Sequence, residues 1–530
     1  MFDLHSDLSR DACHRIFQTR DSRYDGRIFV GVRSTGIYCR PICPARTPKI
    51  ANCTYYRSAA AAQEGGFRPC LRCRPEVSPD LASWRGTSNT VLRGLDLIAA
   101  GALDGDENTV DALAARLGVG ERQLRRLFMQ HLGASPIAVA QTRRLLFAKQ
   151  LLHDTRLPMT EVALAAGFGS IRRFNATFSR LYQRPPRELR RTLKEDLPIT
   201  AQDAVLLRIC YRPPYDWESL LSFFGARAIT GVEVVEGCSY KRTVEMNGHC
   251  GVVQVTNLSA ANQLLVSVRF ACVRALSGIV RRVRRLLDTG ADIEAISQHL
   301  SSDPLLAPLV ARRPGLRTPG GWDGFEVAVR AILGQQITVQ GARQLAGRLT
   351  AAFGEPISAD VSGDARLSHI FPRADRLASA DLTSLGVPRA RAAALSGLAS
   401  AAASDPRLFT SGQSLEEAVE RLRALPGVGE WTAQYVAMRA LRETDAFPAS
   451  DLGLLQAMAS EFGRRPEPAA LLHRAEAWRP WRAYAAQYLW ASNGDAAQAK
   501  KIEKETKHAT ATTVFHRQNS HADRPDANRR

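Results

Sequence analysis

Four cysteines in two close pairs constrain the first part of this chain more than any other feature. Cys39 and Cys43 stand in GIYCRPIC, and Cys70 and Cys73 stand in RPCLRC, with 26 residues between the pairs. Each short loop can place two thiolates around one tetrahedral ion, and a small domain depends on such a metal for its stability. The spacing predicts one Zn²⁺ bound by four cysteines, against the alternative of four incidental reduced thiols.

The charge of the chain indicates what this site faces. The sequence has 71 Lys and Arg against 52 Asp and Glu, a formal net charge of +19 over 530 residues. A cation excess of this size favours a polyanionic partner, and nucleic acid is the leading candidate. Arginines beside the cysteines would lie against DNA phosphates. Three of them are candidate DNA contacts: Arg40, Arg46 and Arg68.

The length and composition exclude several classes of protein. A chain of 530 residues needs more than one hydrophobic core, and 45% hydrophobic with 23% charged residues excludes wholesale disorder. No run of about 18 apolar residues occurs, and the first residues do not form a secretory signal. We therefore expect a cytoplasmic, nucleoid-associated protein with no membrane partner.

Two segments in the second region have the pattern of DNA-binding helix pairs. VDALAARLGVGERQLRRLFMQHLGASP has the apolar spacing of two short helices joined at Gly118, and TEVALAAGFGSIRRFNATFSRLYQRPP repeats it with a turn near Gly167. One such pair can be a mere packing unit, but two in tandem favour DNA binding. The second helix of each pair would enter the major groove. The candidate contacts on these helices are Arg122, Arg125, Arg172 and Arg173.

A glycine-rich turn marks the C-terminal region. RLRALPGVGEWTAQYVAMRAL places Gly427 and Gly429 between two helical patterns, where backbone N–H groups could bind a DNA phosphate. An ordinary turn between helices is the alternative. Asp451 follows about twenty residues later in FPASDLGLLQ, and an Asp at this place is either a helix cap or a catalytic carboxylate.

The N-terminal motifs resemble those of a known family. FVGVRSTGIYCRPICPAR and GFRPCLRCRPE resemble the zinc domain of Ada, in which the first cysteine of the first pair takes a methyl group from a DNA methylphosphotriester. The resemblance implies that Cys39 is the acceptor and that Cys43, Cys70 and Cys73 are the other zinc ligands. The tandem helices resemble the AraC-family domain that follows the zinc domain in Ada. No Pro-Cys-His-Arg motif follows, so we expect no O6-alkylguanine transferase activity.

The C-terminal motifs resemble a second family. YRPPYDWESLLSFFGARAITGVE, AVRAILGQQITV, LPGVGEWTAQYVAMRA and WRPWRAYAAQYLW are similar to AlkA, a helix-hairpin-helix glycosylase of alkylated DNA, over residues 204–493. The resemblance implies that Asp451 stabilises the oxocarbenium-like sugar and orients water, and that Trp431, Tyr435 and Trp481 surround the flipped base.

Two positions bear on how such a glycosylase would work. Trp431 stands where strand-cutting relatives carry a Schiff-base lysine, so the resemblance implies a monofunctional enzyme. Gln335 matches the AlkA pattern, but Gln336 stands where AlkA has an apolar wedge. A polar wedge is less suited to filling the gap left by an extruded base.

Together these features predict a multidomain, mainly α protein with one Zn²⁺. It would activate alkylation-repair genes after accepting a methyl group and would excise 3-methyladenine-type bases, with alkylated and promoter double-stranded DNA and RNA polymerase as partners. One alternative is a methylation-switched transcription factor whose glycosylase-like domain only binds DNA, and another is a zinc-dependent regulator with an inaccessible Cys39. The predicted domains are a small α+β zinc domain (1–80), an all-α tandem helix-turn-helix domain (86–193), an AlkA N-terminal-like α+β domain (199–290), an all-α helix-hairpin-helix domain (291–494) and a disordered basic tail (495–530).

Overall fold

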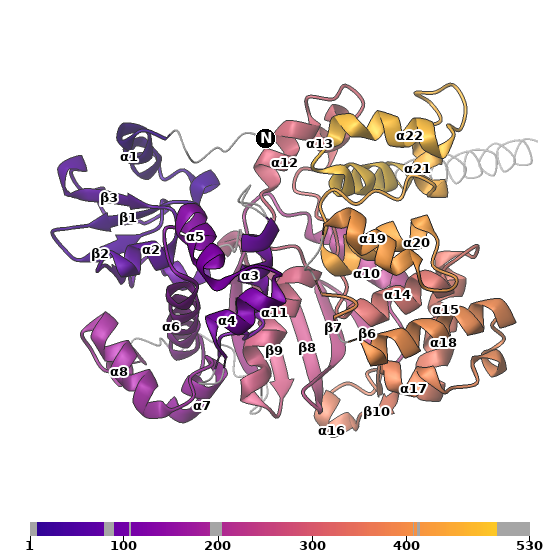
Figure 1. The fold of residues 1–530 in the computed structure, drawn as a ribbon, viewed down its shortest axis with the longest axis horizontal. Helices are drawn as coiled ribbons and strands as arrows, with labels where there is room; N and C mark the ends of the chain where they lie inside the picture. The colour runs from indigo at the N-terminus through magenta and orange to yellow at the C-terminus, as the bar shows by residue number, and fades with distance from the viewer. Residues whose placement is uncertain are drawn as a thin grey trace, which may run out of the picture.

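The computed structural model shows four packed regions: the first two share one end of the long axis, the third lies at the centre and the fourth occupies the other end (Figure 1). It describes residues 8–78, 89–104, 108–190, 204–405, 407–410 and 414–494. The predicted basic tail and the predicted boundaries near residues 80–86 and 193–199 lie outside these ranges. No helix within them is long and apolar enough to cross a lipid bilayer.

The first region is a small α+β unit whose sheet brings the cysteine pairs together. Strand β2 pairs in parallel with β4, with Ile37 opposite Arg68 and Tyr38 opposite Pro69. Because Cys39 ends β2 and Cys70 directly follows β4, this register places the two cysteines side by side. The elements, in the sheet order β3-β1-β2-β4, are α1 (Arg10–Gln18), β1 (Phe29–Val32), β2 (Ile37–Cys39), β3 (Cys53–Tyr56), α2 (Ala59–Glu64) and β4 (Arg68–Pro69).

The second region contains the two predicted helix-turn-helix units. Gly118 and Gly167 adopt left-handed φ angles of 69° and 87° at the two turns, as a tight reversal between helices requires. A long central helix, α6, joins the units and buries most of its residues. The helices are α3 (Asn89–Ala99), α4 (Val110–Arg116), α5 (Glu121–Leu132), α6 (Pro136–Asp154), α7 (Met159–Ala165), α8 (Ile171–Tyr182) and α9 (Pro186–Arg190).

The third region is an antiparallel five-stranded sheet at the centre of the molecule (Figure 1). Its core is continuous with that of the second helix-turn-helix unit, since Phe174 and Phe178 of α8 belong to the same cluster as Val255 and Val266 of the sheet. The elements, in the sheet order β5-β9-β8-β7-β6, are β5 (Val205–Cys210), α10 (Trp217–Arg227), β6 (Glu233–Glu236), β7 (Ser239–Met246), β8 (His249–Leu258), β9 (Gln263–Phe270) and α11 (Leu276–Leu286).

The fourth region is helical and contains the predicted hairpin. Residues 424–429 join α19 to α20, and Gly427 has a φ of 76° with Ala394 closely packed against it. The main helices are α12 (Ile293–Leu300), α13 (Ala307–Arg312), α14 (Gly324–Leu333), α15 (Val339–Phe353), α16 (Ala359–Ser362), α17 (Ala374–Ala378), α18 (Arg389–Ser404), α19 (Leu415–Arg423), α20 (Glu430–Val436), a π-helical turn (Ala437–Leu441), α21 (Leu452–Ala457), α22 (Pro468–Ala475) and a last helix over 482–494; two short strands, β10 (Glu355–Pro356) and β11 (His369–Ile370), pair with each other.

Buried charges hold the N-terminal unit against its neighbours. Lys149 of α6 is fully buried and donates to Glu76 Oε2 at 2.6 Å and to the Cys70 carbonyl at 3.0 Å. Burial favours the neutral Glu76 carboxyl, but the cations of Lys149 and Arg74 outweigh it and hold the pKa of Glu76 below its usual value. Asp292, the cap of α12, pairs with Arg27 and Arg212 across a second boundary. The predicted multidomain, mainly α fold is confirmed.

Candidate functional site

The four predicted cysteine ligands form one cluster. The sulfur atoms of Cys39, Cys43, Cys70 and Cys73 all lie within 4.8 Å of one another. The Arg40 backbone N–H donates to Cys73 Sγ at 3.3 Å, and the Arg72 N–H donates to Cys70 Sγ at 3.4 Å. Four sulfurs at this separation, with N–H donors, fit the tetrahedral thiolate shell that Zn²⁺ prefers. The protein therefore has a site for one Zn²⁺.

Cys39 is the most accessible of the four cysteines. Cys43, Cys70 and Cys73 are buried, whereas Cys39 is half-buried; Cys39, Cys43 and Cys70 all line a cavity of about 450 Å³. The cavity is also lined by Pro41 and Leu71. Because Cys39 is the least buried of the four residues and lines this cavity, the alternative of an inaccessible Cys39 receives no support from this geometry.

The three arginines predicted to contact DNA around the metal have different surroundings. Arg46 is exposed and Arg68 half-buried, and both line the Cys39 cavity. Arg40 is only 4% exposed, because its guanidinium pairs with Asp25 and donates to the Cys73 carbonyl at 2.9 Å. The prediction that Arg40 contacts DNA is therefore wrong: this arginine supports the metal-binding loop from inside.

The predicted recognition helices present their arginines to solvent. Arg122 and Arg125 are exposed on α5, and Arg172 and Arg173 are exposed at the start of α8. Arg125 forms an ion pair with Glu121 one turn earlier, at 2.5 Å. Both helices bury one apolar face in the core of their unit. Their polar faces have the form needed to enter a DNA groove.

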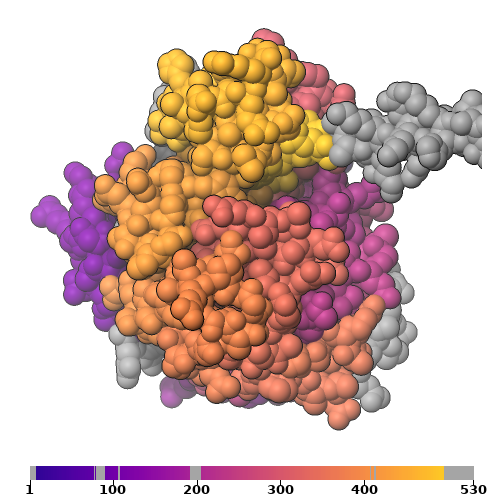
Figure 2. Space-filling view, turned by 90° about the vertical axis from the view of Figure 1, so that its right-hand side faces the viewer, coloured from indigo at the N-terminus to yellow at the C-terminus, as the bar shows by residue number. Residues whose placement is uncertain are grey.

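A second site lies in the helical region, in a cleft of about 1200 Å³. Figure 2 shows the face of the molecule formed by the helical region, with its C-terminal helices in orange and yellow. The cleft is lined by α20, the start of α21 and the last helix on one side, and by the end of α14, the following loop and α15 on the other. Asp451 lies in the cleft as the cap of α21, where its Oδ1 accepts from the N–H groups of Gly453 at 2.9 Å and Leu454 at 3.1 Å.

Two tryptophans orient the same carboxylate. The Trp431 indole N–H donates to Asp451 Oδ2 at 2.8 Å, and the Trp490 indole N–H donates to Oδ1 at 2.8 Å. Four N–H groups therefore fix this side chain while the residue remains only half-buried. A simple helix cap needs only the backbone donors, so the two indole donors hold this carboxylate more firmly than capping requires.

The aromatic wall of the cleft differs from the prediction at one position. Trp431 and Tyr435 line the cleft and stack with ring centres 5.2 Å apart, as expected. Trp481 does not line it and instead packs edge-on against Tyr484. Trp490, on the last helix, provides the second tryptophan. The assignment of Trp481 to the pocket is wrong because the motif contains several tryptophans and sequence alone does not show which one faces Asp451.

Arginines that the sequence did not single out also line the cleft. Arg439, from the π-helical turn, is 3% exposed and lies 4.9 Å from the Phe223 ring, 5.4 Å from Tyr435 and 5.2 Å from Trp490. Burial lowers the pKa of Arg439 to about 10. Arg227 lies 4.1 Å from the Phe223 ring. The cleft therefore combines π faces with fixed positive charge.

The loop before α15 lies at the mouth of the cleft. Gln335 donates to the Gly427 carbonyl and to Thr432 Oγ1, both at 3.0 Å, and so ties this loop to the hairpin. Gln336 is exposed and has a φ of 58°, a left-handed conformation uncommon for a residue with a side chain. Gly429 is the N-cap residue of α20 and lines the cleft. Leu452, next to Asp451, is 68% exposed and is a further cleft residue that the sequence did not single out.

Comparison with known proteins gives three matching family models. They are the metal binding domain of Ada over residues 12–76, a helix-turn-helix domain over residues 113–192 and the AlkA N-terminal domain over residues 206–323. The first match falls on the zinc-binding unit and the second on the helix-turn-helix region, while the third covers the sheet region and extends over α12 and α13 of the fourth region.

Curated relatives match along the chain as well. A Mycobacterium tuberculosis protein named "Probable bifunctional transcriptional activator/DNA repair enzyme AlkA" is 41% identical over 489 residues, which is 92% of this chain and 97% of that protein. DNA-3-methyladenine glycosylase 2 of Escherichia coli is 34% identical, covering 54% of this chain and 96% of its own. The Escherichia coli bifunctional transcriptional activator/DNA repair enzyme Ada is 35% identical, covering 28% of this chain and 40% of its own.

Proposed function

Because the chain belongs to the family of bifunctional transcriptional activator/DNA repair enzymes of the Ada and AlkA type, we propose that it combines two alkylation responses. Its N-terminal half accepts a methyl group from DNA methylphosphotriesters and then activates alkylation-repair genes. Its C-terminal half is a DNA glycosylase that excises alkylated bases of the 3-methyladenine type. The observation that carries this proposal is the presence in one chain of an accessible cysteine in a four-thiol site and an indole-held carboxylate in an aromatic cleft.

The methyl-transfer half rests on the geometry at Cys39. Bound Zn²⁺ keeps the thiols deprotonated and thereby supplies a thiolate. The Cys39 sulfur attacks the methyl carbon, the carbon–oxygen bond breaks, and its electron pair remains on the phosphate oxygen. The thioether formed is stable, so each chain reacts once. One negative charge is lost beside the DNA, and the affinity for DNA therefore rises.

The regulatory half rests on the exposed recognition helices. α5 and α8 would read successive major-groove segments of promoter DNA, and methylation of Cys39 would increase occupancy there. RNA polymerase is the partner such an activator requires. As an activator of this kind, the protein would act on DNA in the cytoplasm, at the nucleoid.

The glycosylase half rests on Asp451 and the cleft around it. The carboxylate lies where it can stabilise positive charge developing on the deoxyribose as the N-glycosidic bond breaks, and it can accept a proton from the attacking water. Trp431 and Tyr435 offer π faces for a flipped base. Since Trp431 occupies the position of the Schiff-base lysine, the product is an abasic site without strand cleavage.

A regulator whose glycosylase-like domain only binds DNA is the second candidate. DNA binding alone gives no reason to fix a carboxylate with two indole N–H groups inside a deep cleft. A glycosylase needs both the fixed carboxylate and the cleft around it.

Reciprocal substitutions test the proposal. Asp451→Asn should lower base release by about 100-fold or more and leave methyl uptake by Cys39 unchanged. Cys39→Ser should abolish methyl uptake and leave base release unchanged. Zinc content and thermal unfolding of both variants serve as folding controls. Loss of both activities from either substitution in a folded, zinc-loaded protein would contradict the two-site account.

A further inference from the structure

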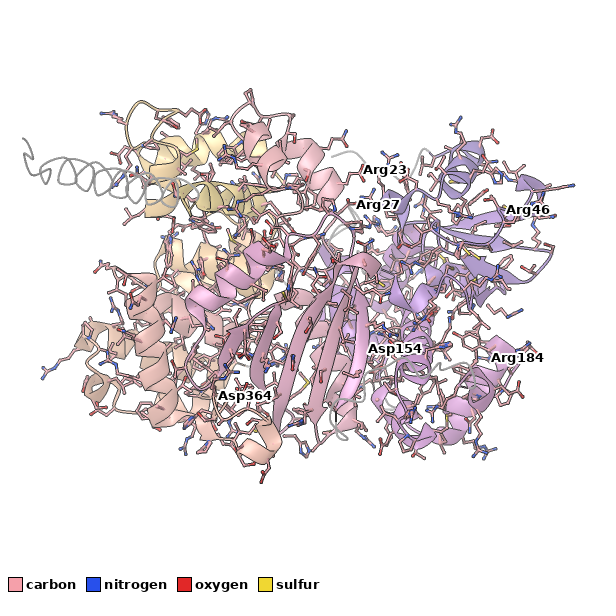
Figure 3. The ribbon with its side chains drawn as sticks, turned by 180° about the vertical axis from the view of Figure 1, so that it is seen from behind. Arg23, Arg27, Arg46, Asp154, Arg184 and Asp364 are labelled. Carbon is pink, nitrogen blue, oxygen red and sulfur yellow. The ribbon has the colours of Figure 1, made fainter. Side chains whose placement is uncertain are left out.

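The cavity at Cys39 has walls from two regions of the chain. Most of its lining comes from the zinc-binding unit, including Arg46, Arg68 and Arg72. The remaining wall comes from the end of α8 and from α9, through Tyr182, Arg184 and Leu189. Figure 3 shows Arg46 and Arg184 on the same side of the molecule, one on each of these two regions. The methyl-acceptor site is therefore closed on one side by the second helix-turn-helix unit.

Apart from the cysteine ligands, the charged side chains that line the cavity are all arginines. Its lining includes four arginines, Arg46, Arg68, Arg72 and Arg184, and neither Asp nor Glu. None of the four guanidinium groups forms an ion pair within the described ranges, whereas Arg40 and Arg74 nearby are paired with carboxylates. An unpaired cluster of this kind is suited to DNA phosphate.

The backbone at Arg184 is fixed by its neighbours. Two residues before it, Tyr182 is 3% exposed and stacks on Phe178 with ring centres 4.4 Å apart. Gln183 ends α8 in a left-handed conformation, and Pro186, which is buried, begins α9. The Lys149–Glu76 pair meanwhile anchors α6 to the zinc-binding unit. Arg184 is thus held at the cavity wall by the fold itself.

We propose that the second helix-turn-helix unit completes the methyl-acceptor site and that Arg184 is its ligand for the DNA phosphate. This inference rests on the proposed methyl transfer. The triester that enters is neutral at the reacting phosphorus, and it becomes an anionic diester when the carbon–oxygen bond breaks and the methyl group moves to sulfur. A cation at Arg184 gains its attraction to that group as the charge develops, so it accelerates transfer. It also couples methyl uptake to the unit that reads promoter DNA.

The test uses the full, zinc-loaded chain and DNA carrying labelled methylphosphotriesters. Arg184→Gln should lower the rate of methyl transfer about 10-fold, a smaller loss than that of a fully buried oxyanion donor because Arg184 is exposed. Arg184→Lys should recover most of the rate. The matched control is Arg187→Gln, an exposed arginine of α9 that does not line the cavity, and it should change the rate less than twofold.

Two further measurements distinguish failure of this inference from failure of the proposed methyl transfer. The dependence of DNA affinity on salt should weaken in Arg184→Gln by a slope of about 0.9, one phosphate contact, and base release should stay unchanged in every variant. Equal effects of Arg184→Gln and Arg187→Gln would overturn the inference while leaving the proposed methyl transfer intact. Absence of methyl uptake by the unsubstituted chain would instead overturn the proposed function.

Discussion

The cavity at Cys39 and the cleft at Asp451 are built in different ways. The first depends on a metal in a unit with small hydrophobic clusters, and all of its ligands lie between Cys39 and Cys73. The second lies within a large helical core and draws residues from Phe223 to Asn493. The metal ligands of the first site are local in sequence, although part of its cavity wall comes from α8 and α9, and the site fails when the metal leaves. A site made by packing is dispersed in sequence and withstands that loss.

Removing Zn²⁺ should produce the largest difference between the responses of the two sites. A chelator should abolish methyl uptake and unfold the N-terminal unit, because binding of Zn²⁺ by a small four-ligand site contributes about 10 kcal/mol to folding. Base release should stay within about twofold, since the metal-ligating group found among the described residues lies in the N-terminal unit. Thermal unfolding and both activities, measured on the same sample, check this. Parallel loss of base release would show that the sites are not independent.

Replacing Trp490 tests whether its hydrogen bond to Asp451 contributes to base release. Trp490→Phe removes the indole donor to Asp451 Oδ1, and a hydrogen bond to a charged group contributes about 1.5–3 kcal/mol. Base release should therefore fall about 10- to 100-fold, with methyl uptake unchanged. Single-turnover kinetics on alkylated DNA measure this effect.

Trp481→Phe is the matched control, because Trp481 lies outside the cleft. Its rate of base release should change less than about threefold. If Trp481→Phe were the more damaging of the two, the placement of Trp490 beside the carboxylate would be contradicted.

The smallest expected effect is a pH dependence of the unfolding free energy, which arises where the two halves of the chain meet. Burial raises the pKa of Glu443 to about 7, with Arg93 of α3 opposing the shift and Asp96 adding to it. A carboxyl with a raised pKa stabilises the fold below its ordinary pKa near 4.5, and this contribution is lost as the pH rises through 7. Unfolding free energy should thus fall by about 1–2 kcal/mol from pH 5 to pH 8 through this group.

Glu443→Gln should remove that part of the pH dependence. Denaturant unfolding at both pH values measures it. An unchanged difference between pH 5 and pH 8 in the variant would show that another group is responsible.

The sequence predicted the local features of both sites and missed the distant ones. The cysteine ligands, the glycine turns at Gly118 and Gly167 and the cap position of Asp451 follow from short spacings, and the structure has them. The burial of Arg40 depends on Asp25, which lies fifteen residues earlier and has no motif of its own.

The walls of the cleft also depend on contacts between distant residues that the sequence does not predict. Arg439 and Phe223 meet only because α10 packs near the π-helical turn, more than two hundred residues away in sequence. Trp490 faces Asp451 because of the direction of the last helix, and no spacing distinguishes it from Trp481. Packing between distant elements decides these positions, so patterns in a single sequence do not predict them.

The most direct test of two alkylation activities in one chain follows the fate of labelled methyl groups. Zinc-loaded protein is incubated with methylated duplex DNA, and the label is measured on protein, as free base and in DNA. We predict label on the Cys39 peptide together with released methylpurine from a single preparation. Label on protein without free base would leave only the regulator, and free base without labelled protein would make the four-cysteine site purely structural; either result would contradict the account.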